Sequence, residues 1–149
     1  MFDRFERFSF AIMSISRYWH KIVSDEMEKY GLKGPYAIYL VALLKYSDGI
    51  TAARLGELCG KDKSDVSRMM NVMENKGLVY KEGSNRYRAL IKLTDEGKNA
   101  AKHVQGRAKI AVDIAGRELT ENDREIFYNS LERIATNLQT ISEDGLPQV

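Results

Sequence analysis

The stretch KDKSDVSRMMNVMENKGLVYKEGSNRYRALIKLT, residues 61–94, changes its pattern halfway along. The apolar residues of its first half recur at the spacing of one helix face; they are Val66, Met69, Met70 and Met73. Gly77 is suited to end that helix, because glycine readily adopts the left-handed conformation that follows many helices. The second half predicts two short strands, 78–81 and 88–93, joined by a loop that contains Gly and Asn. We therefore expect a helix followed at once by a β-hairpin.

A second short helix and a tight turn precede this stretch. Thr51 can cap a helix over residues 52–59, in which Leu55 and Leu58 would point inward. Gly60 then allows the chain to turn into the next helix. Two short helices joined by such a turn predict a helix-turn-helix, and the hairpin that follows would be its wing.

The second helix, residues 63–76 with Asp62 or Ser64 as its cap, carries a polar face opposite the apolar one. That face consists of Ser64, Ser67, Arg68 and Asn71. The second helix of a helix-turn-helix lies in the DNA major groove, where Arg can bind guanine, Asn can bind adenine and Ser can bind either. We therefore expect this face to contact bases. Spacing alone leaves an alternative open, because Ser, Arg and Asn also occur on ordinary solvated helix faces.

Basic residues flank the polar face on both sides. Lys61 and Lys63 stand at the start of the second helix, where they can neutralise phosphates. The hairpin adds further cations, and a basic wing can reach the neighbouring minor groove or the DNA backbone. The predicted DNA-binding residues are Thr51, Lys61, Lys63, Ser64, Ser67, Arg68, Asn71, Lys81, Arg86 and Arg88.

Long amphipathic helices are predicted at both ends of the chain. The N-terminal one repeats apolar residues in steps of four and three; the row is Met1, Phe5, Phe8, Ile12, Ile15, Trp19 and Ile22. The C-terminal one, capped by Thr120, repeats the same steps; the row is Phe127, Leu131, Ile134, Leu138 and Ile141. Heptad rows pack along other helices, and burying one large apolar side chain contributes ~1.5–3 kcal/mol. The two rows therefore predict an obligate dimer.

The remaining segments complete a mainly α fold. Pro35 can open a buried helix that continues through YAIYLVALLKY, and Thr94 can cap a helix that reaches about Gly116. The expected architecture is a winged helix-turn-helix with long N- and C-terminal dimerisation helices. Residues 34–98 would form the DNA-binding domain, while residues 1–33 and 99–149 would form the helical dimerisation region.

Composition narrows the class of protein. The 149 residues carry a net charge of only +2, yet residues 51–98 hold ten Lys or Arg against seven Asp or Glu, so the predicted DNA-binding region is the basic part. The single cysteine, Cys59, rules out an intrachain disulfide, which fits the reducing cytoplasm. The longest uncharged run, residues 34–44, has eleven residues and is too short for a membrane helix, which needs about 20. We expect a cytoplasmic protein that does not bind membranes.

Neither an enzyme nor a metalloprotein is expected. The sequence has no glycine-rich phosphate loop, no nucleophile motif and no paired acidic motif. Its two histidines, His20 and His103, have no metal-ligand spacing to each other or to Cys59, so we expect no metal and no cofactor. Cys59 is expected to be a small buried hydrophobe, and a redox-sensitive thiol is the alternative.

The segments TAARLGELCGKDKSDVSRMMNVMENKGLV and LIKLTDEGK resemble the MarR family of winged helix-turn-helix transcriptional regulators. The matching residues are Leu55, Leu58, Asp62, Lys63, Ser64, Val66, Ser67, Arg68, Glu74, Lys76, Gly77, Leu78, Val79, Leu93, Thr94 and Gly97. The resemblance implies a homodimer with interlocked terminal helices and one winged helix on each side. The wing departs from the family pattern, because a shortened loop carries Asn85-Arg86 in place of Asp-Arg. We therefore expect Arg86 to contact phosphates.

The resemblance also implies a cleft between the dimer helices and the winged helix that binds small aromatic or anionic effectors. The candidate residues are Arg17, Tyr18, Trp19, His20, Tyr36 and Tyr39. Aromatic core packing is the alternative role for these side chains. The expected function is sequence-specific repression of transcription by a homodimer on a pseudo-palindromic double-stranded operator, with release by such an effector. The competing functions are a winged-helix protein-interaction subunit and a thiol sensor that uses Cys59.

Overall fold

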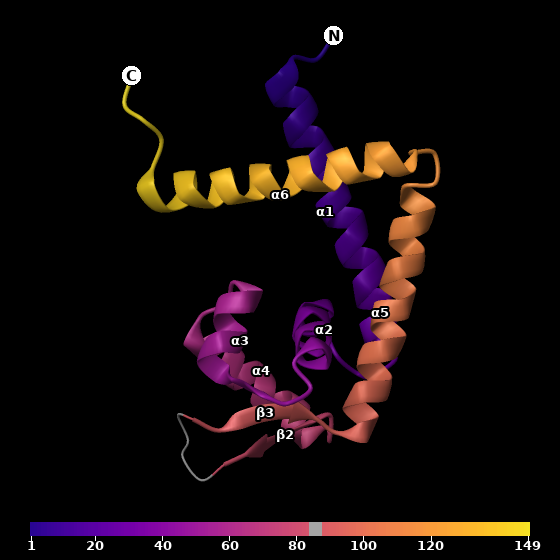
Figure 1. Ribbon diagram of the computed structural model, residues 1–149, viewed down its shortest axis with the longest axis vertical. Helices are drawn as coiled ribbons and strands as arrows, with labels where there is room; N and C mark the ends of the chain where they lie inside the picture. Colours follow the sequence, from indigo (N-terminus) through magenta and orange to yellow (C-terminus); the bar gives the residue numbers. More distant parts are fainter. Residues whose placement is uncertain (84–87) are drawn as a thin grey trace. The chain divides into compact units, whose positions relative to one another are not determined.

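The computed structural model of the chain describes residues 1–83 and 88–149. It is mainly helical with one small sheet, which confirms the fold class predicted from the sequence (Figure 1). The elements in chain order are α1 (Arg4–Glu28), η1 (Gly34–Tyr36), α2 (Ala37–Lys45), β1 (Ile50–Thr51), α3 (Ala52–Cys59), α4 (Lys63–Asn75), β2 (Val79–Glu82), β3 (Leu90–Leu93), α5 (Asp95–Ala115) and α6 (Glu121–Asp144).

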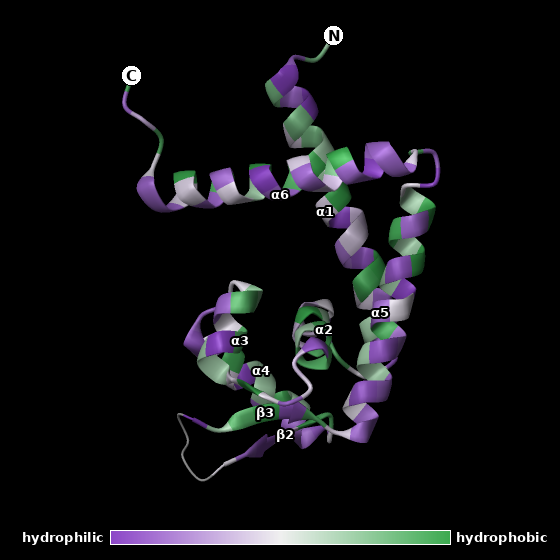
Figure 2. Ribbon diagram, in the orientation of Figure 1, coloured by the Kyte–Doolittle hydropathy of each residue, from purple (hydrophilic) through white to green (hydrophobic). Residues whose placement is uncertain are grey.

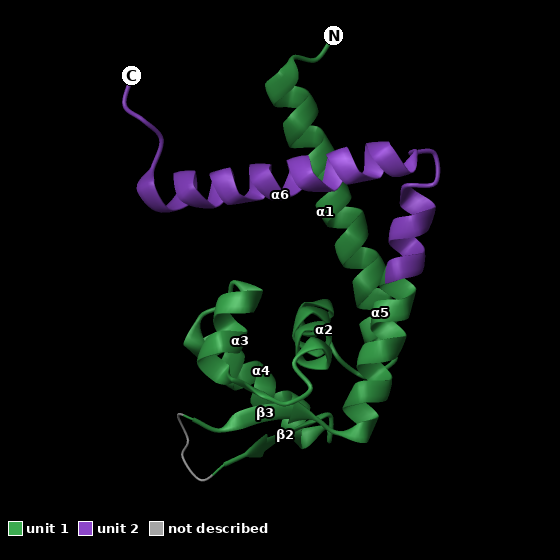
Figure 3. Ribbon diagram, in the orientation of Figure 1, with its two compact units in different colours: residues 1–108 green, residues 109–149 purple. Residues whose placement is uncertain are grey.

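The chain divides into two compact units, residues 1–108 and residues 109–149 (Figure 3). The first unit contains every element from α1 to β3 and most of α5, and the second contains the end of α5 and all of α6. The predicted DNA-binding region, residues 34–98, therefore lies wholly within the first unit.

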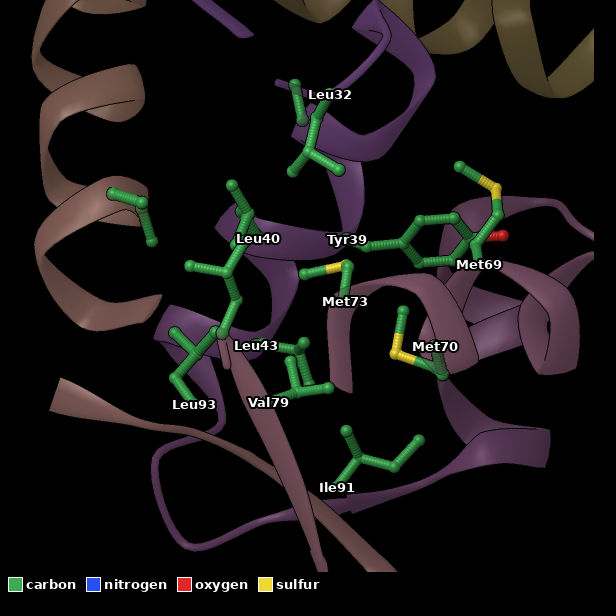
Figure 4. Close-up of a cluster of buried hydrophobic side chains, with 14 of the residues drawn as sticks. Leu32, Tyr39, Leu40, Leu43, Met69, Met70, Met73, Val79, Ile91 and Leu93 are labelled. Atoms are coloured by element: carbon green, nitrogen blue, oxygen red, sulfur yellow. The ribbon is translucent and has the colours of Figure 1, made fainter. Parts of the chain in front are cut away.

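The core of the first unit lies where α2 and α4 meet the sheet (Figure 4). Its most deeply buried large side chains are Met27, Tyr39, Leu40, Leu43, Leu55, Val66, Met70, Met73, Val79 and Ile91. Helix α2 buries Ala37, Tyr39, Leu40 and Leu43 along one broad face, while Ile38 is 47% exposed; its sequence AIYLVALLK is apolar except at its last position. Figure 2 shows α2 and β3 largely in the hydrophobic colour, in agreement with this central position. Unbroken apolar sequence is what a buried helix requires.

The sheet has three strands in the order β1-β3-β2, all antiparallel. Strand β1 pairs Ile50 with Ile91, and β2 pairs Val79 with Leu93. Strand β1 was not predicted from the sequence, because two residues are too few to show strand alternation. Strand β2 begins one residue later than predicted, and β3 begins two residues later.

Side-chain caps start most of the helices. Asp3 and Glu6 form a reciprocal capping box at α1, so Met1 lies outside the helix although it fits the apolar row. Asp62, not Ser64, caps α4 by accepting from the backbone N–H of Asp65. Thr120 caps α6 as predicted, and it forms a capping box with Asp123. Helix α1 ends at Glu28, and Gly31 follows with a φ of +66°.

The apolar rows of α1 and α6 remain on the surface of the single chain. Ile15 of α1 is 57% exposed and Leu138 of α6 is 47% exposed. Figure 2 shows hydrophobic residues recurring along both helices between hydrophilic ones. Leu58 was expected to point inward but is also exposed. Among the described residues, no helix combines the length and apolar character needed to cross a bilayer.

Candidate nucleic-acid interface

The turn between α3 and α4 sets the position of the second helix. Gly60 adopts φ +64° and ψ +36° after Cys59, a left-handed conformation that strains residues with a side chain. Its backbone N–H donates to the carbonyl of Glu57, and that of Lys61 donates to Gly56, which closes the end of α3. The chain can then enter α4 after only three residues, as a helix-turn-helix requires.

Helix α4 has the two faces that the sequence predicts. Its inner face is buried in the core of the first unit and consists of Val66, Met69, Met70 and Met73. Its outer face is exposed and consists of Ser64, Ser67, Arg68 and Asn71. The inner residues fix the rotation of the helix about its axis, because four packed side chains must be moved to turn it. The outer polar side chains are therefore presented to solvent together.

The other predicted phosphate contacts surround this helix. Lys61 and Lys63 are exposed at its start, and Arg88 is exposed just before β3. Thr51 already has a structural role, because its hydroxyl oxygen accepts from the backbone N–H of Arg54 and caps α3. Arg86 lies outside the described residues.

Nearby carboxylates pair with the two lysines of the wing strands, Lys81 and Lys92. Lys81 Nζ lies 3.8 Å from a carboxylate oxygen of Glu74, and Lys92 Nζ lies 2.6 Å from one of Glu82. The hydrogen bond to Glu82 raises the pKa of Lys92, so this lysine stays charged but paired. Residues 61–76 likewise hold four basic and three acidic residues. The candidate interface is thus only mildly positive. The polar face of α4 is therefore stronger support for DNA binding than the net charge is.

Asp65 is a functional candidate that was not among the residues predicted from the sequence. Its Oδ1 accepts a 2.6 Å hydrogen bond from Nη2 of Arg68, and its Oδ2 accepts a 2.9 Å bond from the hydroxyl of Tyr39. Spacing could have revealed the first contact, because residues three apart share a helix face. The second joins α2 to α4 and depends on tertiary packing.

The six candidate effector residues fall into different environments. Tyr39 is fully buried, so the structure gives it the core role that was the alternative for these aromatics. Tyr36 is half-buried, at the end of η1. Tyr18 and Trp19 are exposed on α1. Arg17 already contacts Tyr18, with its guanidinium carbon 4.9 Å from the ring centre, and His20 lies 3.3 Å from the hydroxyl of Ser16.

Cys59 ends α3 and is half-buried against the core. Burial raises the pKa of its thiol, and the nearby charge of Lys61 opposes that shift in part. The thiolate is the reactive form of cysteine, so this environment disfavours reaction at neutral pH.

Comparison with known proteins gives the interface its context. Residues 30–86 match the model of the MarR family, a span that begins just after α1 and ends between β2 and β3 in the sequence. No curated protein matches the chain. The solved structures that it resembles include proteins of this family, and the resemblance inferred from the sequence motifs is confirmed.

Three solved structures illustrate the likeness. A MarR-family protein from Listeria monocytogenes, solved with a 26-mer DNA, superposes with a TM-score of 0.81 at 21% identity over 100% of this chain and 99% of that one. A MarR transcriptional regulator from Methanosarcina mazei Go1 superposes with a TM-score of 0.79 at 23% identity, over 95% of this chain and 94% of that one. The transcriptional regulator SlyA superposes with a TM-score of 0.79 at 24% identity, over 92% of this chain and 95% of that one. At these identities the likeness establishes the fold.

Proposed function

We propose that this chain, whose residues 30–86 match the MarR family, is a transcriptional regulator that binds double-stranded DNA in a sequence-specific manner. The observation that carries the proposal is the exposed polar face of α4, held in one orientation by four buried side chains. Arg and Asn on a helix in the major groove can each form paired hydrogen bonds to a base edge. The Listeria relative that was solved with DNA supports the same use of this fold.

We further propose that the regulator acts as a homodimer. The support is the apolar surface of α1 and α6, where Phe5, Ile15 and Leu138 are each more than 40% exposed in the single chain. Leaving such rows in water is unfavourable by ~1.5–3 kcal/mol per large side chain, relative to burial. Residues 1–33 and 99–149 would form the dimer, and residues 34–98 would bind DNA.

A two-fold dimer implies a two-fold operator. Its half-sites should lie about one DNA turn apart, which gives a pseudo-palindrome of roughly 15–20 bp. Repression is the simplest outcome of occupying such a site. An aromatic or anionic effector that binds near Tyr18, Trp19 and Tyr36 would weaken DNA binding, and a coupling of ~1–3 kcal/mol would suffice for a switch.

Selection from a random DNA pool tests the main proposal. The wild-type protein should enrich a pseudo-palindromic motif, and Arg68→Ala should lose preference at one position in each half-site, at a cost of ~1–3 kcal/mol. If no motif is enriched, or if Arg68→Ala lowers the affinity for operator and scrambled DNA equally, the proposed reading by α4 is wrong.

Sedimentation tests the dimer. The wild type should be dimeric at micromolar concentration, and Ile15→Asp should dissociate it by placing a charge in the apolar row. Lys21→Asp is the matched control, because Lys21 pairs with Asp25 on the side of the same helix that is opposite the apolar row. A wild type that sediments as a folded monomer would contradict the homodimer.

A further inference from the structure

The carboxylate of Asp65 is shared between a buried side chain and an exposed one. Oδ2 accepts from the hydroxyl of Tyr39 at 2.9 Å, and Oδ1 accepts from Nη2 of Arg68 at 2.6 Å. The side chain of Asp65 is 22% exposed and that of Arg68 is 70% exposed. A line of hydrogen bonds therefore runs from the core, through Asp65, to the outer face of α4.

The buried end of this line is rigid. Tyr39 is fully buried in α2, and Figure 4 shows its ring among the methionine side chains of α4, including Met69 and Met73. A packed aromatic ring has little rotational freedom, so the position of its hydroxyl is set by the core. That hydroxyl in turn fixes one oxygen of Asp65, and the backbone N–H of Asp65 is fixed by Asp62 at 2.8 Å.

The exposed end gains orientation rather than stability. An ion pair between residues three apart on a helix contributes little to folding when one partner is as exposed as Arg68. A charge-assisted hydrogen bond as short as 2.6 Å nevertheless restricts a long arginine side chain that would otherwise sample many rotamers. The guanidinium has five N–H donors, so a single bond to Asp65 leaves enough to contact both O6 and N7 of guanine.

We propose that Asp65, anchored by Tyr39, is a positioning residue that presents Arg68 to a guanine in each half-site of the operator. The inference rests on the proposed function of the preceding section. A carboxylate beside Arg68 also repels phosphates, which makes this arginine a poorer contact for the DNA backbone and favours its use on a base edge. The arrangement therefore increases discrimination between sequences while it lowers affinity for DNA in general.

Distinct effects are expected from changing the two partners of Arg68. Asp65→Asn should lower the preference for guanine about tenfold at the position that Arg68→Ala relaxes, which lies within the range for a paired arginine–guanine contact. Its affinity for scrambled DNA should be unchanged or higher, because a negative charge is lost. Tyr39→Phe should lower the same preference by a smaller factor, because it removes the anchor and keeps the carboxylate. The double variant with Asp65→Asn and Arg68→Ala should lose base preference at the same operator position and at no other.

The matched control is Glu57→Gln on α3. It removes an ion pair between residues that are also three apart, since Arg54 Nη1 lies 3.3 Å from Glu57 Oε2. This pair has no anchor to Tyr39, and Glu57→Gln should leave the guanine preference within twofold of wild type.

The experiment combines selection from a random pool with titrations. Each full-length variant is titrated on the selected operator, on the operator with the Arg68-dependent guanine replaced, and on scrambled DNA, and its melting temperature is recorded. The inference is supported if Asp65→Asn reduces the guanine preference at the same operator position that Arg68→Ala relaxes. The inference is overturned if Asp65→Asn keeps the full guanine preference. It is also overturned if Asp65→Asn loses preference at a different position, because Asp65 would then contact a cytosine directly. Should Asp65→Asn fail to fold, Tyr39→Phe decides in the same way.

Failure of the inference differs from failure of the proposed function. A wild type that enriches no motif removes the function itself. If the wild type enriches a motif, and its guanine preference depends on Arg68 but not on Asp65 or Tyr39, the proposed function stands. Only the positioning role of Asp65 is then wrong.

Discussion

Glu26 of α1 and His103 of α5 lie far apart in the sequence, but Oε2 of Glu26 is 3.0 Å from Nε2 of His103. The same carboxylate accepts from Nε of Arg107 at 3.1 Å and from Nζ of Lys29 at 2.7 Å. One acidic side chain therefore joins the end of α1 to the middle of α5. The hydrogen bonds from Lys29, His103 and Arg107 lower the pKa of Glu26 from its ordinary 4.5 to about 2, against a smaller opposing effect of burial.

Removing this carboxylate should make the protein less stable in a way that depends on pH. Because the pKa of Glu26 is lower in the folded state, its contribution is complete above about pH 4.5 and disappears as the pH falls towards about 2. Urea unfolding of wild type and Glu26→Gln should therefore differ at pH 7 and converge across that window. Asp25→Asn is the control, since Asp25 pairs with Lys21 on the exposed side of α1. A difference that stays constant from pH 7 to pH 2.5 would contradict the assignment.

Gly97 should tolerate no side chain, whereas Gly106 in the same helix should. A methyl group on Gly97 would run into the backbone carbonyl of Leu78 and lie 3.1 Å from Cδ2 of Leu93. Overpacking of this kind costs ~1–3 kcal/mol, and here the obstacle is backbone that cannot turn aside. A methyl group on Gly106 meets nothing within 4 Å and should stabilise α5 by up to ~1 kcal/mol. Chemical denaturation of Gly97→Ala and Gly106→Ala should give changes of opposite sign.

Cys59 should react slowly and should not be needed for DNA binding. Burial raises the pKa of its thiol, so little thiolate is present at neutral pH. We expect Cys59→Ser to bind the operator within twofold of wild type, and a thiol reagent to modify the folded protein far more slowly than the unfolded chain. Rapid modification that releases the wild type from DNA, with no effect on Cys59→Ser, would instead establish the thiol-sensor function.

Arg88 and Lys92 should differ in how they affect the salt dependence of binding. Arg88 is exposed next to β3. Lys92 Nζ lies 2.6 Å from Oε2 of Glu82, so the charge of Lys92 is partly neutralised. Replacing Arg88 with Ala should reduce the slope of log K against log salt by about 0.9 per protomer, on operator and on scrambled DNA alike. Lys92→Ala should change the slope less. Titrations between 50 and 200 mM salt, a range over which phosphate contacts weaken binding strongly, provide the measurement.

The helices of this chain could be predicted because their signals are local. Caps such as Thr51 and Thr120, and the apolar spacing of Val66 and Met73, lie within a few residues of the structure that they specify. The outer face of α4 follows directly from that spacing, so most of the candidate interface was visible in the sequence. Whether these residues bind DNA stays a prediction.

The parts that could not be predicted depend on distant segments. Strand β1 exists because Ile50 and Thr51 find partners in β3, and two residues carry no pattern of their own. The contact between Tyr39 and Asp65 depends on how α2 packs against α4. Leu58 lies three residues after buried Leu55 yet is 41% exposed, because the side of α3 that meets the core is centred on Leu55, Gly56 and Cys59 and leaves Leu58 at its edge. Tertiary packing decides each case.

The pairing of β1 with β3 also has a consequence for the order in which the chain folds. Both helices of the helix-turn-helix and strand β2 lie between Ile50 and its partner Ile91. The backbone hydrogen bonds of α3 and α4 join residues close in sequence, so these helices can begin to form early, while β1 must wait until β3 is available. Joining distant strands carries the larger loss of chain entropy. Helix α4 is therefore expected to acquire its secondary structure first, and closure of the sheet to be a late, slower step.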